Sequence, residues 1–404
     1  MPGVFRRLVG QHAVEAELVA AARAARGGSA RDVAATGTMT HAWLLTGPPG
    51  SGRSVAALCF AAALQCTSDG TPGCGECRSC TTTMAGTHAD VRRIVPEGLS
   101  IGVDEMRAIV QIASRRPTTG RWQIVVVEDA DRLTEGAANA LLKVVEEPPP
   151  STVFLLCAPS VDPEDIAITL RSRCRHVPLV TPTAAAIAQV LIDGDGLSEE
   201  QAHWAAAVCG GHVGRARRLA TDPDARDRRA RALGLARDSA TPKRAYAAAE
   251  DLVAAAEAEA KALNAGRDEA ESEELRTAMG SGGTGKGTAG ALRGAAGAIK
   301  DLEKRQKSRQ TRSSRDALDR ALTDLATYFR DALLVASGAN GVSANHPDMA
   351  DRVGALAAYA SPQRLLRCIE AVLECREALA VNVKPKFAVD AMVATVGQAL
   401  RADL

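Results

Sequence analysis

The chain has 404 residues, of which 24% are charged and 3% are aromatic, and its formal net charge is +1. A nearly neutral chain has no strong global field that would draw it onto nucleic acid or a membrane. The scarcity of aromatic residues leaves little material for a base-stacking platform. The segment before Gln11 contains no apolar core of a leader peptide, and no apolar run reaches about 18 residues. We therefore expect a soluble, cytoplasmic protein of two or three domains.

The first half of the chain alternates between helical and strand-like patterns. Residues 5–26 predict one alanine-rich helix, and residues 27–40 predict a loop. Short apolar runs predict buried strands over 41–46, 91–95, 124–127 and 153–157. Helical patterns fall between them, over 55–65, 103–115 and 137–146. This alternation predicts an α/β fold with an open parallel sheet and helices on both of its faces.

A glycine-rich loop separates the first predicted strand from the next helix, with the sequence Gly47-Pro48-Pro49-Gly50-Ser51-Gly52-Arg53-Ser54. It fits the phosphate-binding pattern G-x-x-x-x-G-K-[ST] at every position but one, because Arg53 stands where lysine belongs. Gly47, Gly50 and Gly52 keep the tight backbone that can cradle a phosphate. Arg53 retains the positive charge on a bulkier planar fork, and Ser54 retains a hydroxyl that can ligate magnesium.

The acidic pair at the end of the strand over 124–127 is also altered. It reads Glu128-Asp129, the reverse of the usual Asp-Glu order in an ATPase of this kind. The swap lengthens one carboxylate arm and shortens the next by a methylene, and misplacement by about 1 Å can cost on the order of 100-fold in rate. We expect weak or absent ATP turnover, with nucleotide binding left open. The alternative is that the site only supports the fold.

Four of the ten cysteines lie close together, as Cys66, Cys74, Cys77 and Cys80, in a glycine-rich segment over 66–80. Tightly spaced C-x-x-C pairs in a reducing compartment favour metal over disulfides. Four thiolates fill a tetrahedral zinc site and leave no open position, so the predicted role of zinc is structural. Most of the other cysteines, such as Cys59, Cys157 and Cys209, are expected to be core residues.

The rest of the chain is predicted to be helical. A small unit over 181–221 precedes a helical region over 222–404, and a glycine-rich break over 280–297 interrupts an insertion spanning about 262–312. Residues 280–287 imitate a second phosphate-binding loop, but no strand precedes them and Gly287 replaces the serine or threonine, so we interpret them as a linker. The acidic and basic stretches beside the break are interpreted as solvated helix faces, with a DNA or partner contact as the alternative.

Three segments together resemble the bacterial clamp-loader branch of the AAA+ proteins. They are residues 139–148 (Asn-Ala-Leu-Leu-Lys-Val-Val-Glu-Glu-Pro), the Ser172-Arg173-Cys174 motif and residues 380–389 (Ala-Val-Asn-Val-Lys-Pro-Lys-Phe-Ala-Val). The four-cysteine segment fits that family as well, and the resemblance spans nearly the whole chain outside the glycine-rich insertion. It implies a RecA-like domain with a zinc module over 1–180, a three-helix lid over 181–221 and an all-α collar domain over 222–404.

The resemblance also assigns roles to individual residues. It places Val9 and Gly10 in the adenine pocket and implies that Arg173 is an arginine finger acting on a neighbouring subunit's ATP. The two sensor positions fall near Ala158 and Gly214, neither of which carries the expected polar group, although a shift of one residue would bring Arg215 to the second. With Arg53 and the Glu128-Asp129 pair, these departures resemble the catalytically degenerate members of the family.

The implied partners are the tau/gamma ATPase subunits and the delta subunit of a five-membered ring, together with the sliding clamp and primer-template DNA. Two other interpretations remain open. The chain could be an active ATPase of the tau/gamma type, which Arg53 and the swapped carboxylates disfavour. It could also be a zinc-dependent nucleic-acid binder, but Arg78 is the sole basic residue between the four cysteines.

Overall fold

The computed structural model describes residues 3–26, 38–279, 288–339 and 341–401, and these residues form two compact units. The first unit comprises Met1–Pro96 and Ser100–Arg217, and the second comprises Glu97–Leu99 and Arg218–Leu404. The predicted lid over 181–221 thus falls mostly within the first unit. Its separation from residues 1–180 as a domain of its own stays a prediction.

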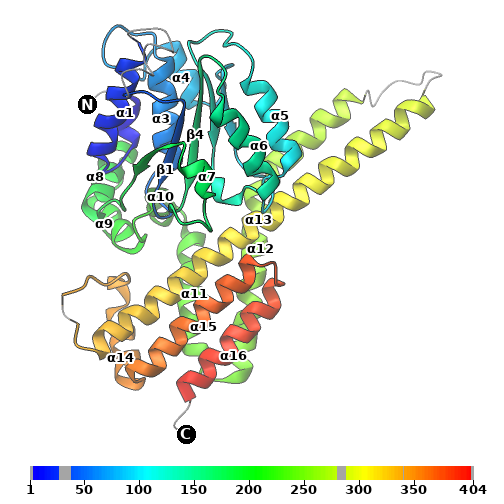
Figure 1. Cartoon of the computed structure of the whole chain (residues 1–404). Helices are drawn as coiled ribbons and strands as arrows, with labels where there is room; N and C mark the ends of the chain where they lie inside the picture. The colour runs from blue at the N-terminus through cyan, green and yellow to red at the C-terminus, as the bar shows by residue number, and fades with distance from the viewer. Residues whose placement is uncertain (1–2, 27–37, 280–287, 340, 402–404) are drawn as a thin grey trace. The chain divides into compact units, whose positions relative to one another are not determined.

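A five-stranded parallel sheet forms the centre of the first unit (Figure 1), in the order β2-β3-β4-β1-β5. Its strands are β1 (Ala42–Thr46), β2 (Val91–Ile94), β3 (Gln123–Val127), β4 (Thr152–Ala158) and β5 (Arg175–Pro178). The first four strands confirm the sequence prediction. The prediction missed β5, because this edge strand buries Val177 but carries polar or exposed residues around it, so it has no apolar run.

Helices cover both faces of the sheet, as the alternating pattern predicted. They are η1 (Val4–Arg7), α1 (His12–Ala24), α3 (Arg53–Gln65), α4 (Arg78–Met84), α5 (Val103–Ala113), η2 (Ala130–Arg132), α6 (Glu135–Glu146) and α7 (Ile168–Arg171). Successive strand residues point to opposite faces, so Trp43 and Leu45 join one apolar core while Leu44 joins the other.

The prediction of one helix over 5–26 is wrong, because the segment breaks between Arg7 and His12. Gly10 adopts a φ of 71° at the break, a left-handed conformation that glycine adopts without strain. Gln11 lies between the two helices, and its side chain bonds to the backbone of two other segments. Its amide nitrogen donates to the carbonyl of Ser51 at 3.2 Å, and its amide oxygen accepts from the N–H of Val180. The break therefore ties the start of the chain to the glycine-rich loop.

Three helices follow the sheet, as expected for the lid: α8 (Ala184–Asp195), α9 (Glu199–Val208) and α10 (Val213–Thr221). Their beginnings follow ordinary capping rules. The hydroxyl of Thr183 accepts from the N–H of Ala186, and that of Ser198 accepts from the N–H of Gln201.

The described part of the second unit is helical throughout and contains no strand. It comprises α11 (Pro223–Asp238), α12 (Pro242–Ala278), α13 (Thr288–Ala336), η3 (Pro347–Met349), α14 (Ala350–Tyr359), α15 (Pro362–Ala380) and α16 (Pro385–Arg401). The predicted break over 280–297 is too long, because α13 begins at Thr288; residues 280–287 lie outside the described residues. Among the described helices, none combines the length and apolarity needed to cross a membrane.

A buried histidine in the second unit holds the segment before η3 onto α11 and α13. His346 is 2% exposed, and its Nδ1 lies 2.8 Å from a guanidinium nitrogen of Arg229, which also binds Asp348 through two bonds. Because a guanidinium can only donate, Nδ1 must accept, so the proton lies on Nε2, 3.1 Å from the carbonyl of Asp324. The bonds therefore require neutral histidine.

We expect the second unit to lose stability as the pH falls below about 6.5. Burial first, and then the charge of Arg229, lower the pKa of His346, although Asp324, Asp331 and Asp348 act in the opposite direction and Tyr328 packs nearby. A depressed pKa means that the unfolded chain binds the extra proton, so this stability is present above the unfolded pKa and is lost towards the folded pKa. Urea unfolding of wild type and His346→Gln between pH 5 and 7.5 measures this loss of stability. The wild type should lose up to about 1.4 kcal/mol per pH unit more than the variant, and equal slopes would contradict it.

Candidate functional site

The glycine-rich loop runs from the end of β1 to the start of α3, as the sequence predicted. Gly50 and Gly52 have φ values of 89° and 94°. A Cβ atom at Gly50 would lie 2.6 Å from the Cα of His212, which belongs to the turn before α10. A side chain has no room at this position, so glycine is required both by the backbone conformation and by the close approach of His212.

A cavity of about 1090 Å³ opens beside this loop within the first unit. Its lining includes five of the predicted nucleotide-site residues: Val9, Gly50, Gly52, Arg53 and Ser54. Gly47 and Gly10 do not line it, because Gly47 lies against Leu179 and Ser51, and Gly10 lies against Pro182. The volume suits a small-molecule ligand. The sequence did not identify Arg6, Arg7, Asp193 or His212, which line the same cavity from other elements.

The side chain of Arg53 folds back onto the loop that carries it. One guanidinium nitrogen donates to the carbonyl of Gly47 at 2.8 Å. In a working phosphate-binding loop the lysine at this position reaches toward the outer phosphates. Here the cation is engaged by the backbone, so Arg53 stabilises the loop itself in this structure.

The two carboxylates after β3 are also held by arginines. Glu128 is 9% exposed and forms an ion pair with Arg93 of the neighbouring strand β2, and its hydrogen bond raises the pKa of Arg93. Asp129 has a φ of 52° and lies 3.9 Å from a guanidinium nitrogen of Arg132. Neither carboxylate lines the cavity. The lining of the cavity therefore includes most of the glycine loop and Val9, but not the acidic pair.

Neither residue that the resemblance places at a sensor position, Ala158 or Gly214, has a polar side chain. Ala158 ends β4 and is fully buried. Gly214 lines the cavity, whereas Arg215 does not. The backbone N–H of Arg215 donates to Nδ1 of His212 at 3.2 Å, so His212 caps the start of α10. A nearby cation is Arg217, which pairs with Asp195 at 2.6 Å.

The four cysteines of the predicted zinc module come together. The Sγ atoms of Cys66, Cys74, Cys77 and Cys80 all lie within 4.8 Å of one another. Zn–S bonds of about 2.3 Å in a tetrahedron put the sulfurs about 3.8 Å apart, so the arrangement fits one zinc ion. Burial opposes ionisation of Cys77, but hydrogen bonds from the N–H groups of Thr67 and Cys80 lower its pKa to about 6. A thiol with so low a pKa supplies one thiolate for a metal, whereas burial raises the pKa of Cys80.

Other cysteines behave as core residues. Cys59, Cys157 and Cys209 are buried, as the sequence predicted. Burial raises the pKa of Cys59 to about 12, so its thiol stays protonated.

Arg173 lies just after α7 and is exposed. One guanidinium nitrogen is 2.6 Å from a carboxylate oxygen of Glu146 on α6, and another donates to the carbonyl of Thr169 at 3.0 Å. The two side chains of the ion pair are 39% and 42% exposed. A pair this exposed contributes about 0–1 kcal/mol and opens easily. Arg173 does not line the cavity, so it takes no part in this chain's own glycine-loop site.

Two family models match the chain. The first, described as "DNA polymerase III, delta subunit", matches residues 29–183, and the second, "DNA polymerase III, delta subunit, C terminal", matches residues 312–385. The first covers the glycine loop, the four cysteines and Arg173. The second covers most of the helical region after the glycine-rich insertion, so together the models reach both units.

The relatives that are similar in sequence are named either delta' subunits or gamma/tau subunits of DNA polymerase III. The delta' subunit of DNA polymerase III from Escherichia coli is 39% identical over 35% of this chain and 43% of that protein, and the Bacillus subtilis delta' subunit is 32% identical over 39% and 47%. The gamma/tau subunit from Mycobacterium bovis is 32% identical over 44% of this chain and 28% of that protein. The chain thus aligns with less than half the length of these relatives.

Among solved structures, the chain is similar to a DNA polymerase III gamma-subunit-related protein from Thermotoga maritima. It covers 93% of this chain and 100% of its own, at 16% identity and a TM-score of 0.40. The family assignment rests on the two sequence models and on the relatives named as subunits of DNA polymerase III. The chain belongs to the family of DNA polymerase III clamp-loader subunits.

Proposed function

We propose that this chain is the delta prime subunit of a DNA polymerase III clamp loader, an AAA+ subunit without ATP turnover of its own. In this role it joins tau/gamma ATPase subunits and a delta subunit, and the assembly places a sliding clamp on primer-template DNA. At least five of the relatives are named delta' subunits, at 32–40% identity. The role carries with it a cytoplasmic location at the replisome.

The proposed loss of ATP turnover rests on one observation: the groups that hydrolysis would need are already paired with partners inside the protein. Glu128, the first carboxylate after β3, is paired with Arg93, while the guanidinium of Arg53 is bonded to Gly47. Hydrolysis needs one carboxylate on magnesium and another near the attacking water, with a cation on the outer phosphates. Each of these groups is here directed to a partner within the protein.

We expect the isolated chain to hydrolyse ATP no faster than a protein-free control. Arg53→Lys should not restore turnover, because Glu128 remains paired with Arg93 and the acidic pair remains reversed. A coupled assay of phosphate release with Mg²⁺ measures both proteins. Turnover by the wild-type chain well above the control would reject the proposal.

The second candidate is an active tau/gamma-like ATPase, which the match to the gamma/tau subunit favours. The same assay separates the two, because only this candidate predicts turnover by the chain alone. Nucleotide binding does not separate them, since the cavity can accept a ligand in either case.

Within the delta prime proposal, the chain is organised as a RecA-like domain over 1–180 with a zinc module over 66–80, a lid over 181–221 and a collar over 222–404. Zinc in the module is structural. Arg173 acts as an arginine finger on the ATP of an adjoining subunit. A subunit that has lost its own ATPase can still need such a residue, because in a ring each ATP lies at a subunit boundary.

A further inference from the structure

Helices α12 and α13 extend beyond the other helices of the second unit as an antiparallel hairpin (Figure 1). We call residues 262–279 of α12 and 297–312 of α13 the arm. Both family models leave it uncovered except at residue 312, because the first ends at residue 183 and the second begins at 312. The arm is thus a part of this chain to which the family match assigns no role.

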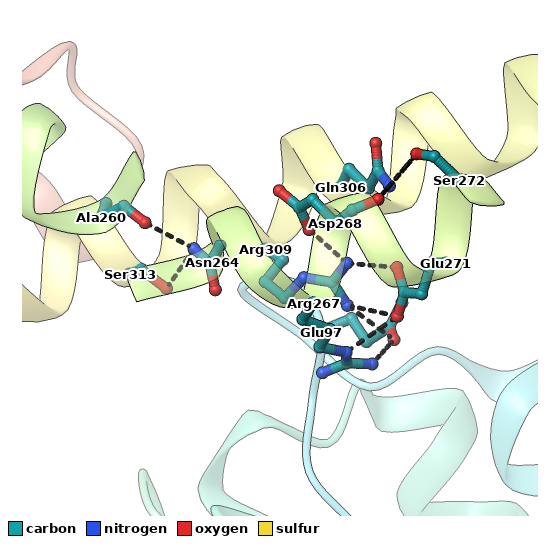
Figure 2. Close-up of polar contacts among 10 residues, drawn as sticks. All are labelled: Glu97, Ala260, Asn264, Arg267, Asp268, Glu271, Ser272, Gln306, Arg309 and Ser313. Atoms are coloured by element: carbon teal, nitrogen blue, oxygen red, sulfur yellow. Dashed lines mark hydrogen bonds and ion pairs between the residues drawn. The ribbon is translucent and has the colours of Figure 1, made fainter. Parts of the chain in front are cut away.

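Polar residues hold the two helices of the arm together (Figure 2). Asn264 donates at 3.1 Å to the hydroxyl of Ser313, the residue next to the arm, and Gln306 donates to the hydroxyl of Ser272 at 3.3 Å. Between these layers the guanidinium of Arg309, 6% exposed, binds Asp268 at 2.6 Å and Glu271 at 2.5 Å. Polar layers between helices fix their register and add little stability.

The same contacts neutralise part of the arm's charge. Glu271 also pairs with Arg267, and Arg267 and Arg309 both reach the carboxylate of Glu97, which belongs to this unit. Hydrogen bonds from Arg309 lower the pKa of Glu271. Asp268 and Glu271 are therefore paired inside the arm. The exposed acidic residues of the arm are Glu269, Glu273, Glu274, Asp301 and Glu303.

Three lysines, Lys300, Lys304 and Lys307, lie exposed on α13 of the arm. Their i, i+4, i+7 spacing places them within about 60° of one another around the helix and about 10.5 Å apart along it. None of them makes an ion pair with another described residue. One strand of a DNA duplex has a phosphate every 3.4 Å or so along the axis, so the row of lysines spans about three phosphates.

We propose that these three lysines bind the phosphate backbone of duplex DNA. The proposal goes beyond the clamp-loader role and rests on it for the presence of DNA. The contact is independent of base sequence, because ammonium groups that meet phosphates read no base edges. It holds this helical arm to the duplex on which the complex works.

An acidic protein partner fits the face less well. Lysine is depleted at protein–protein interfaces, whose binding energy comes from buried aromatic, arginine and other large anchors. Among the described arm residues, the exposed large apolar side chains are Leu263 and Ile299. Exposed Asp301 and Glu303 lie between Lys300 and Lys304 on the same helix, so the attraction is modest and should be greatest at low salt.

The test is the salt dependence of DNA binding by the full-length chain, measured by fluorescence anisotropy with a labelled primer-template duplex. The variant K300Q/K304Q/K307Q removes three charges and keeps good helix formers. The matched control, K243Q/R244Q/K261Q, removes three exposed cations from α12 of the same unit. Circular dichroism checks that both remain helical.

Three phosphate contacts contribute about 2.7 to the slope of log K against log [salt]. Between about 50 and 200 mM salt the wild type and the control should therefore lose about 40-fold more affinity than the triple lysine variant. No DNA binding by wild type at low salt, or equal slopes for wild type and the lysine variant, would overturn the proposal. Co-elution with a tau/gamma-type ATPase, measured separately, tests the clamp-loader role, so the two failures can be told apart.

Discussion

The wild-type chain should carry one zinc ion, and Cys77→Ser should lose it. Four sulfurs within 4.8 Å fit a tetrahedral ion, and removing one leaves three ligands and a mobile turn. Structural zinc sites in small modules contribute apparent binding free energies of about 10–16 kcal/mol, much of it as folding free energy. The variant should therefore lose nearly all bound metal and melt at a lower temperature. Elemental analysis and thermal unfolding measure both effects.

The control for this experiment is Cys174→Ser, which changes a cysteine outside the cluster. It should keep one zinc per chain. X-ray absorption on the wild type should give four Zn–S bonds of about 2.3 Å. Wild-type protein without zinc, or Cys77→Ser that retains a full equivalent, would exclude the module.

Arg173→Ala should depress clamp-stimulated ATP turnover at the adjoining subunit while leaving this chain folded and assembled. Arginine fingers contribute roughly 10³–10⁵ in rate at the site that they serve. Other boundaries of the ring keep their own fingers, so total turnover should fall only in part and clamp loading should fall more. Steady-state phosphate release and a clamp-loading assay with primed DNA measure the two effects.

Two variants distinguish the finger from a local structural role. Arg171→Ala removes an exposed arginine two residues away and should load clamps like the wild type. Glu146→Gln removes the ion-pair partner of Arg173. If the pair itself mattered, Glu146→Gln would reproduce the defect of Arg173→Ala. The finger account expects Glu146→Gln to load clamps at the wild-type rate, and wild-type loading by Arg173→Ala contradicts it.

The sheet could be predicted from sequence where burial on both faces leaves a continuous apolar run. β1 and β4 are buried at every position, and both were found within a residue or two of their ends. β5 was missed because an edge strand needs few apolar residues. The prediction of one helix over 5–26 was wrong because the residues on both sides of Gly10 have a helical pattern, which does not reveal the turn between them.

At the candidate site, local sequence predicted the loop and the cysteines but not the partners of the charged groups. The glycine loop and the four cysteines are each continuous in the chain, so their spacing is visible. The pairing of Arg93 with Glu128 joins two strands far apart in sequence. A prediction that β2 and β3 are neighbouring parallel strands could have suggested this ion pair, because Arg93 and Glu128 then lie at the same end of the two strands. The close approach of His212 to Gly50 could not be predicted from sequence, because only tertiary packing brings the two residues together.

The most direct test of the central claim combines the chain with a tau/gamma-type ATPase and a delta subunit and follows ATP turnover with sliding clamp and primed DNA. The account predicts that the chain hydrolyses no ATP alone, enters the assembly, and raises clamp-dependent turnover by the ATPase subunits. Failure to assemble, or an assembly whose turnover and clamp loading are the same without the chain, would contradict it.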